Sequence, residues 1–340
     1  MSMEPIAVTS APSNREVLLA ISIDTECDKG PEWKTRFPLS FRSVGEGIAQ
    51  RLTPLFREHG LTPTYLLSPE VMQDAGSVKA LGALGGCELG THLHGEFVEP
   101  QADFAAPATS TPQIAYAPEI ERRKLANLTD LFVTRFGRRP VSFRAGRFAL
   151  AGRTLSFLED LGYSVDSSVT PFRTNEFAGG LSSNFWGAPL APYHPSVRDP
   201  RKRGRLRLLE VPVTILAPSL ARWPRFLLRR LSDRASRSRP IRAIAGGTVE
   251  KLWVRPLRGT AEQLLSWADA VIGSWEARST PVLNVMFHSV EAVAGASPYA
   301  RTEDEVEGLL ADLGRLFAHL HRRHRLVPVT LGELSRKVGA

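Results

Sequence analysis

The strongest constraint on the fold is the regular alternation of strand-like and helix-like segments along the 340 residues. Apolar, β-rich runs such as residues 17–23 (VLLAISI) are followed by amphipathic stretches such as residues 43–60, and the pattern recurs about seven times. This alternation indicates a parallel sheet wrapped by helices. At about 150 residues per domain the length allows one or two domains, and α/β barrels often exceed 250 residues as a single domain.

The expected strands are residues 17–23, 62–67, 87–89, 141–143, 164–165, 209–214, 282–287 and 326–329. The expected helices are residues 43–60, 77–84, 118–136, 154–161, 221–241, 261–275, 303–322 and 331–338. We predict a disordered tail over residues 1–15, an exposed loop over residues 100–111, and a single barrel domain over residues 16–340.

Three features bear on the cellular compartment. The sequence has no run of about 18 apolar residues that would span a membrane, and its first residues do not read as a signal peptide. Two cysteines, Cys27 and Cys87, are too few for a disulfide framework and suit a reducing compartment. We therefore expect a cytoplasmic protein.

The positive charge is concentrated in one segment. The formal net charge is +8, but residues 196–260 hold 17 Arg and Lys against four Asp and Glu, so this segment carries +13 and the remainder −5. A uniformly basic nucleic-acid-binding protein would not show this distribution. The sequence therefore predicts a mildly acidic body with a basic insertion.

The first expected strand ends in two acidic residues, Asp24 and Glu26. Side chains two positions apart in an extended chain point the same way, so both carboxylates face one region. Taken alone, such residues are more often caps that accept hydrogen bonds from nearby backbone amides.

The third expected strand is followed by two histidines, His92 and His94, with the same spacing. A lone His-x-His pair is usually without function. Two neutral imidazoles beside a carboxylate on a neighbouring strand, however, form a catalytic metal set that leaves room for water. Because the chemistry of parallel α/β sheets lies at the carboxyl ends of the strands, this edge is the candidate site.

Three later strands also end in polar residues, which are Arg144, Asp166 and His288. Each is a weak signal alone, because such residues are more often solvated or paired in ion pairs. Together, five strand ends present groups that serve hydrolytic chemistry, and burying charged groups is costly unless they are partnered.

The order of these motifs resembles the polysaccharide deacetylases of carbohydrate esterase family 4, the NodB-homology enzymes. Asp24 and its neighbours match the acidic motif, and residues 90–96 match the first histidine motif. The other matching stretches are residues 62–66 (TPTYL), 143–146 (FRAG), 165–166 (VD) and 287–289 (FHS). The resemblance extends from about residue 17 to about residue 329, apart from much of the basic segment.

The resemblance implies a distorted (β/α)7 TIM-like barrel and metal-dependent removal of N-acetyl groups from amino sugars. It makes Asp24 the general base, with Arg144 holding its carboxylate in position. His288 is then the acid that protonates the departing amine, and Asp166 tunes His288 through a hydrogen bond. Glu26, His92 and His94 are the expected ligands of a divalent ion, for which Zn²⁺ is favoured.

Two positions depart from the family pattern. Thr25 stands where the acidic motif usually has a second aspartate, and Glu96 stands where the second histidine is expected. Glu96 is therefore an alternative to His94 as the third ligand. These departures are also compatible with a member of the family whose catalytic activity is altered or lost. For Cys27 and Cys87, we favour small buried residues over metal ligation.

Within the basic segment, residues 201–207 suggest a hairpin or loop, and residues 221–241 a helix that starts near Pro224. This helix would carry Trp223, Phe226, Leu227 and Leu231 at helical spacing among four arginines. The pattern is typical of a helix lying on an anionic membrane. The alternative is that the apolar stripe packs on the barrel. Nucleic acid is disfavoured as a partner.

The sequence thus predicts a deacetylase-like hydrolase of carbon–nitrogen bonds. Its expected substrate is a carbohydrate intermediate of cell-surface polysaccharide synthesis, in lipid-linked or nucleotide-linked form, at the inner membrane face. One alternative is a barrel hydrolase of a non-sugar, non-peptide C–N bond. The other is a non-catalytic protein that binds glycan or membrane.

Overall fold

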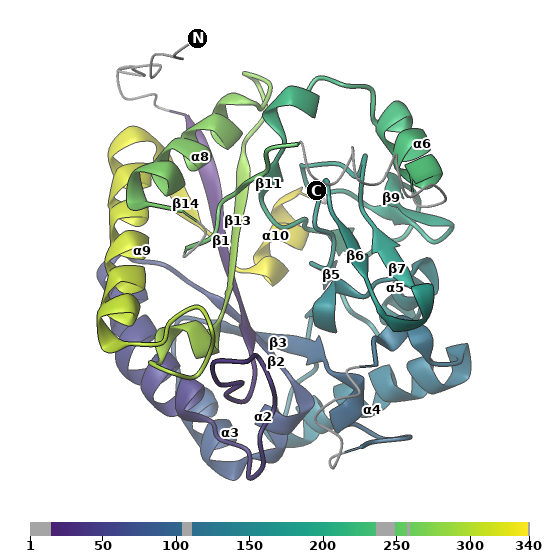
Figure 1. The fold of residues 1–340 in the computed structure, drawn as a ribbon, viewed down its shortest axis with the longest axis vertical. Helices are drawn as coiled ribbons and strands as arrows, with labels where there is room; N and C mark the ends of the chain where they lie inside the picture. The colour runs from purple at the N-terminus through teal and green to yellow at the C-terminus, as the bar shows by residue number, and fades with distance from the viewer. Residues whose placement is uncertain (1–14, 104–110, 236–248, 257–258, 339–340) are drawn as a thin grey trace.

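A parallel sheet forms the centre of the computed structural model, which describes residues 15–103, 111–235, 249–256 and 259–338 (Figure 1). The sheet has eight strands, which run side by side in the order β10-β5-β4-β3-β2-β1-β13, with β14 also paired to β1. Their bounds are β1 Glu16–Thr25, β2 Thr64–Leu67, β3 Glu88–Leu93, β4 Ser142–Ala145, β5 Val165–Asp166, β10 Leu209–Glu210, β13 Val282–His288 and β14 Arg325–Pro328.

Strand β1 pairs with three other strands of the sheet. It pairs with β13 along most of its length, with β14 at its start and with β2 at its end. Nine of its ten residues are buried, because the apolar run after Glu16 is covered on both faces. The register places Asp24 opposite His288, so the two candidate catalytic residues lie at the same edge of the sheet.

The sheet is curled, so that the chain segment after β10, at one end of the strand order, contacts β13 at the other end. The Thr214 amide donates to the carbonyl of Asn284 at 3.2 Å, and the Asn284 amide donates to Thr214 Oγ1 at 2.6 Å. Inside the curl, Asn284 also donates to Ser167 Oγ at 2.9 Å and accepts from Ser22 Oγ at 2.6 Å. The interior of the barrel is therefore a packed polar network at this level.

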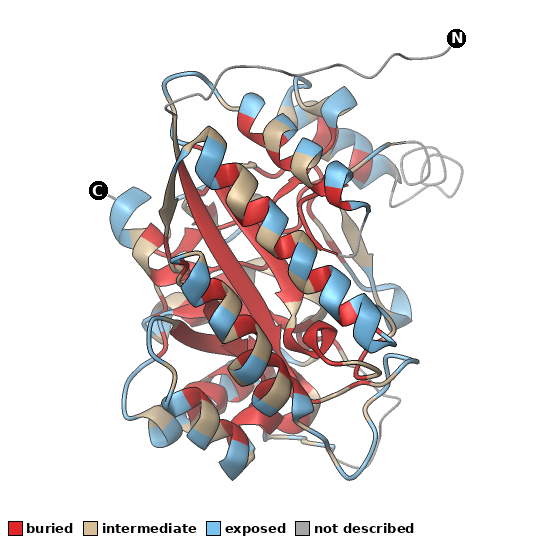
Figure 2. Cartoon of the chain, turned by 90° about the vertical axis from the view of Figure 1, so that its left-hand side faces the viewer, coloured by how far each residue is buried: buried red, intermediate tan, exposed pale blue. Residues whose placement is uncertain are grey.

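Most helices cover the outside of the sheet, with exposed residues facing solvent and buried residues facing the strands (Figure 2). The last helix, residues 331–338, lies inside the curl instead, where Leu331 and Leu334 pack with Leu18 of β1 (Figure 1). The helices are η1 Ser43–Leu52, α1 Thr53–Glu58, α2 Pro69–Gln73, α3 Ala75–Gly82, α4 Pro118–Phe136, α5 Gly152–Asp160, α6 Arg225–Ala235, α8 Ala261–Gly273, α9 Glu303–Arg323 and α10 Leu331–Val338. Short 3₁₀ turns are η2 Gly95–Phe97, η3 Gln113–Ala115, η4 Gly146–Phe148, η5 Ala178–Gly180, η6 Pro218–Leu220 and η7 Ser289–Ala292.

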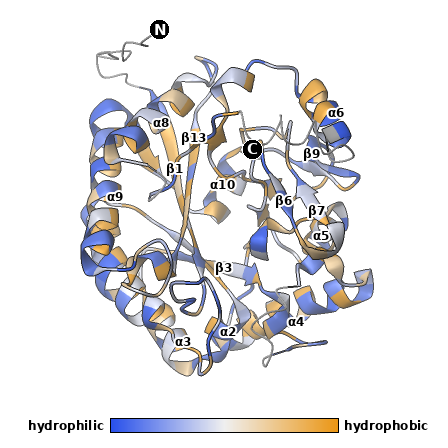
Figure 3. Ribbon diagram, viewed as in Figure 1, coloured by the Kyte–Doolittle hydropathy of each residue, from blue (hydrophilic) through white to orange (hydrophobic). Residues whose placement is uncertain are grey.

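Local sequence explains where these helices start and stop. Helix α4 begins with Pro118 and ends before Gly137, which adopts a left-handed φ of 67°. Thr302 Oγ1 caps α9 by accepting from the Glu305 amide, and the Glu305 carboxylate accepts from the Thr302 amide. The hydropathy view shows the resulting pattern, in which β1 and β13 are hydrophobic inside a more hydrophilic shell (Figure 3).

Most expected elements are present, with one difference near the start of the chain. The helix expected over residues 43–60 is divided into the π-helical η1 and the α-helical α1. The loop expected over residues 100–111 falls largely outside the described residues, as does nearly all of the tail expected over residues 1–15.

Three short antiparallel strand pairs lie outside the main sheet; the first two are hairpins, and the third joins strands that are distant in sequence. They are β6 Thr174–Glu176 with β7 Ser182–Asn184, β8 Pro195–Ser196 with β9 Asp199–Arg203, and β11 Ile215–Leu216 with β12 Leu252–Trp253. The hairpin β8–β9 covers part of the basic run over residues 201–207, where the sequence predicted a hairpin or loop.

The basic helix expected over residues 221–241 is α6, which begins directly after Pro224; residues 236–241 lie outside the described part of the chain. Leu228 is buried against Trp186 and Phe172. Phe226, in contrast, is 60% exposed, and Trp223 and Leu231 are each 46% exposed. The stripe is therefore largely unpacked. In the described ranges, no helix is both long and apolar enough to cross a membrane.

Candidate metal centre and active site

The candidate site is built at the carboxyl ends of parallel strands of the same sheet. Strand β1 delivers Asp24 and, just beyond its last residue, Glu26, while β3 delivers His92. His94 follows β3 directly, as the N-cap of the short turn η2. The register places His92 beside Arg144 of β4. The strand-end residues predicted from the sequence therefore lie at one edge of the sheet, although β2 separates β1 from β3.

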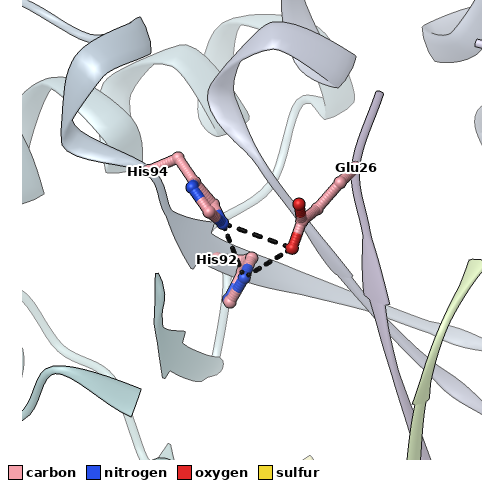
Figure 4. Close-up of side chains that lie close together, drawn as sticks. All are labelled: Glu26, His92 and His94. Carbon is pink, nitrogen blue, oxygen red and sulfur yellow. Dashed lines mark hydrogen bonds and ion pairs between the residues drawn. The ribbon is translucent and has the colours of Figure 1, made fainter. Parts of the chain in front are cut away.

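Glu26, His92 and His94 converge on one point (Figure 4). Glu26 Oε1 lies 3.3 Å from His92 Nε2 and 3.2 Å from His94 Nε2, and the two Nε2 atoms are 3.2 Å apart. In a tetrahedral zinc site with bonds of about 2.0–2.1 Å, ligand atoms lie about 3.3–3.4 Å from each other. The three donor atoms thus have the spacing of metal ligands, and all three residues are buried.

The other nitrogen of each imidazole is held by an acceptor. His92 Nδ1 lies 3.0 Å from the Arg144 carbonyl, which can only accept, so Nδ1 carries the proton. His94 Nδ1 lies 3.4 Å from Glu96 Oε1. In the neutral imidazoles both Nε2 lone pairs then point at the Glu26 carboxylate, an arrangement that a cation between them would stabilise. The residues present fit a divalent metal.

Glu96 supports His94 rather than joining the cluster. Its Oε1 accepts from Arg147 at 2.5 Å as well as facing His94 Nδ1. Burial alone would raise the pKa of Glu96, but His94 and Arg147 outweigh it and hold the pKa well below its usual value. Burial would also lower the pKa of His94, yet Glu26 and Glu96 raise it to about 9. Of the two alternatives for the third ligand, the geometry favours His94.

Lys29 is a site residue that the sequence reasoning missed. Its Nζ lies 3.1 Å from Glu26 Oε2, and its side chain is 6% exposed. Burial would lower the pKa of Lys29, but Glu26 raises it, so the ammonium stays charged. The ion pair holds one carboxylate oxygen and leaves Oε1 facing the histidines. The position of Lys29, three residues after Glu26, was the signal available in the sequence.

Asp24 is fixed by a fully buried guanidinium. Arg144 Nη1 donates to Asp24 Oδ1 at 2.6 Å, and its Nη2 donates to Ser22 Oγ at 2.6 Å and to Ser167 Oγ at 2.9 Å. Burial would raise the pKa of Asp24, but Arg144, His92 and His288 together lower it. Asp24 is therefore an ionised carboxylate whose second oxygen lies 3.8 Å from both His92 Nε2 and His288 Nε2.

His288 completes the group, but its carboxylate partner differs from the expected one. His288 Nδ1 lies 2.9 Å from Oε1 of Glu291, which sits in turn η7 and also accepts from Arg255. Burial would raise the pKa of Glu291, but Arg255 and His288 lower it. A carboxylate three residues after a strand-end histidine was the signal that could have identified Glu291.

The prediction that Asp166 forms a hydrogen bond with His288 is therefore wrong. Asp166 accepts from Ser168 Oγ at 2.6 Å and lies opposite Glu210 in the register of β10 and β5. Burial and the second carboxyl raise the pKa of Glu210 well above its usual value. Asp166 is therefore buried inside the barrel beside Glu210 and does not contact His288.

A cavity of about 480 Å³ opens onto Asp24, Glu26, His92, His94 and His288. Trp33, Phe37 and Phe148 line it, and Trp33 packs edge-on against His288 with ring centroids 5.0 Å apart. Trp33 and Phe148 have φ values of 55° and 56°, a left-handed conformation that costs non-glycine residues energy. Strained backbone at the cavity wall is typical of functional sites.

The two cysteines stay outside the metal cluster. Cys27 is buried and free, and burial raises its pKa, so it is a neutral thiol. Cys87 is also free, and burial raises its pKa as well. The interpretation as small packed residues fits both positions.

Comparisons with known proteins bear on the fold. No family model matches the chain, and neither does any curated protein. Among solved structures, a protein from Mycobacterium smegmatis classed as a polysaccharide deacetylase aligns with 99% of this chain and 95% of its own, at 14% identity and a TM-score of 0.55. A protein from Parabacteroides distasonis classed as a glycoside hydrolase/deacetylase aligns with 96% of this chain and 71% of its own, also at 14% identity and a TM-score of 0.55. The chain therefore has the distorted barrel fold of these structures, as its sequence motifs predicted.

Proposed function

We propose that the protein is a metal-dependent hydrolase that removes N-acetyl groups from a carbohydrate. The observation that carries the proposal is the meeting, at one cavity, of a three-donor metal cluster with a buried carboxylate and a carboxylate-supported histidine. The fold shared with proteins classed as deacetylases is consistent with this chemistry. The residues proposed as metal ligands are Glu26, His92 and His94.

Amide hydrolysis requires an activated water, an electrophile at the carbonyl oxygen, and a proton for the leaving amine. A divalent metal, for which Zn²⁺ is favoured, would polarise the carbonyl and lower the pKa of a water at this site. Asp24 Oδ2 faces the cavity because Arg144 holds Oδ1, so Asp24 is positioned to accept the proton of the attacking water.

His288 supplies the other proton. Its Nδ1 is held by Glu291, and its Nε2 faces the cavity 3.8 Å from Asp24 Oδ2. Protonated His288 donates from Nε2 to the departing nitrogen, while the water oxygen becomes part of the released acetate. Arg144 and Glu291 act as positioning residues, each holding one of the two groups that move protons.

The cavity wall favours a sugar over a different C–N substrate. Trp33 is 36% exposed and Phe37 is 46% exposed at the cavity, and flat aromatic faces of this kind suit a pyranose ring. Glu32, Lys34 and Arg147 add polar groups for hydroxyls. A cyclic amide substrate would not need such an extended rim.

The test is acetate release from N-acetylated oligosaccharides by zinc-loaded protein. We expect activity in the wild type, its loss in Asp24→Asn, and its retention in Asp160→Asn, a control on the exposed face of α5. Hydrolysis of cyclic amides without acetate release would support the C–N alternative. Stoichiometric metal without hydrolysis of either substrate would support a binding protein and refute the enzyme.

We also propose that the enzyme works at the cytoplasmic face of an anionic membrane, on a lipid-linked or nucleotide-linked intermediate of surface polysaccharide synthesis. Phe226 and Leu231 of α6 and Trp223 just before it are exposed among arginines, which supports docking there. The free thiols of Cys27 and Cys87 suit a reducing compartment.

Vesicle flotation tests the docking. We expect anionic vesicles to carry the protein at low salt and Phe226→Glu to reduce the floated fraction. The matched change Val338→Glu, at an exposed valine at the end of α10, should have no effect. Equal flotation of Phe226→Glu and wild type would contradict docking through α6.

A further inference from the structure

A second cavity, separate from the candidate active site, lies between β9 and α6, which are neighbours in Figure 1. Its volume is about 410 Å³, and it shares no lining residue with the candidate active site. One part of the wall is the apolar stretch Pro189, Leu190 and Ala191. The rest consists of five cationic residues, which are Arg201, Lys202, Arg203, Arg225 and Arg229.

Two of these cations already have acidic partners. Arg201 lies 2.9 Å from Asp199 and 2.7 Å from Asp233, and Lys202 lies 3.7 Å from Asp199. The other three, Arg203, Arg225 and Arg229, make no ion pair with any carboxylate in the part of the chain that the structure describes. The adjoining cavity of about 320 Å³ differs, because Asp199 and Asp233 form part of its wall.

The guanidiniums of Arg225 and Arg229 are anchored by the backbone. Arg229 Nη1 donates to the Gly187 carbonyl at 2.9 Å, and Arg225 Nη1 donates to the Ala188 carbonyl. Gly187 has a φ of +74°, and a Cβ at this position would lie 2.5 Å from the Arg225 carbonyl oxygen. Only glycine therefore permits the close packing that fixes both side chains.

This arrangement places like charges together at an energetic cost. Burial lowers the pKa of Arg225, and the neighbouring Arg229 and Arg203 lower it further. Each guanidinium has five N–H donors, and the anchoring contact uses one on each of the two arginines. These donors are held in place and face a cavity that has no acidic residue among the described residues of its wall. Such an arrangement is typical of an anion-binding site.

We propose that Arg203, Arg225 and Arg229 form a binding site for a phosphate or diphosphate group. Guanidinium forks match phosphate oxygens in pairs, and several cations call for an anion with more than one charge. Because the site is separate from the candidate catalytic cavity, it anchors a ligand or partner and takes no part in hydrolysis. The inference does not rest on the proposed function.

Titration calorimetry of the full-length, metal-free protein with pyrophosphate tests the site. We expect saturable binding of one equivalent at low salt. Arg203→Gln and Arg229→Gln should each weaken it roughly tenfold or more, the usual effect of losing a charge-assisted hydrogen bond. Arg203 is exposed and so its variant should fold. Arg205→Gln is the matched control, since Arg205 is exposed two residues away and outside the cavity.

Binding that is absent, or that falls as much in Arg205→Gln as in Arg203→Gln, would overturn the proposal. Competition then identifies the source of the phosphate. Displacement of pyrophosphate by a nucleoside-diphosphate sugar would support a soluble ligand. Displacement by phosphatidylcholine vesicles doped with phosphatidic acid, but not by pure phosphatidylcholine, would support a lipid phosphate. Displacement by neither would refute a site for phosphorylated ligands. No measurement here depends on metal or catalysis, so the proposed hydrolase is tested independently.

Discussion

Replacing Arg144 with methionine removes the guanidinium that holds Asp24 inside the barrel. The two side chains are 0% and 2% exposed, and Arg144 Nη1 lies 2.6 Å from Asp24 Oδ1. In the variant Asp24 stays buried next to Glu26, with its charge unpaired. Breaking a buried ion pair from one side costs about 3–5 kcal/mol. Methionine fills much of the volume but leaves Ser22 and Ser167 without their donors, so we expect a loss of about 4 kcal/mol in unfolding free energy.

Urea unfolding in the presence of a chelator measures this loss, because bound metal would otherwise add to the stability of the native state. The double variant Asp24→Asn/Arg144→Met should recover about 2 kcal/mol, since it no longer buries an unpaired charge. Arg42→Met is the control, because Arg42 pairs with Glu46 at the surface and should cost less than about 1 kcal/mol.

Two outcomes would refute the reasoning about this pair. One is a loss below about 1 kcal/mol in Arg144→Met, which would mean that Asp24 is not a buried charge dependent on its partner. The other is a double variant that costs as much as the two single variants added together. Either result would also remove the argument that Arg144 positions Asp24 for proton transfer.

Three further predictions concern other parts of the barrel. Burial and Asp166 raise the pKa of Glu210 in the folded state, so its stabilising contribution is present at low pH and is lost as pH rises through the raised pKa. Glu210→Gln should therefore increase the free energy of unfolding in urea, relative to wild type, more at pH 8 than at pH 5. An equal difference between variant and wild type at the two pH values would contradict this. Glu291→Gln should lower kcat for acetate release about tenfold to a hundredfold with little change in KM, because His288 loses its supporting charge; an unchanged kcat would count against Glu291 as a positioning residue. Gly146→Ala would place a Cβ 2.3 Å from the carbonyl oxygen of Leu93, the residue between His92 and His94, and should weaken zinc binding measured by calorimetry, whereas Gly82→Ala, which meets nothing within 4 Å, should not.

The sequence predicted the barrel well because its elements carry strong local signals. The apolar run of β1 is long enough to be buried on both faces, and α4 is bounded by Pro118 and Gly137. The convergence of Glu26, His92 and His94 followed from the period of a strand and from the common edge of parallel strands. These inferences depend only on chain geometry near each residue.

What the sequence did not predict depends on which neighbour a side chain meets. Strand-end reasoning placed Asp166 near the site, but the register sets it opposite Glu210, so the two buried carboxyls face each other instead. Glu291 resembles an ordinary turn residue, and Arg255 comes from the basic segment that seemed separate from the barrel. Glu291 reaches His288 through the turn η7, three residues along the chain, whereas Arg255 reaches it only through tertiary packing.

The central claim is that Glu26, His92 and His94 together hold one divalent metal ion. Zinc titration of metal-free protein, read by calorimetry with metal analysis of the dialysed complex, tests it directly. We predict one equivalent in the wild type and in His319→Ala, whose imidazole pairs with Asp269 away from the site. His92→Ala and His94→Ala should each lose that equivalent. A full equivalent of zinc retained in His92→Ala would show that His92 is not a ligand and that these three residues do not form the metal site.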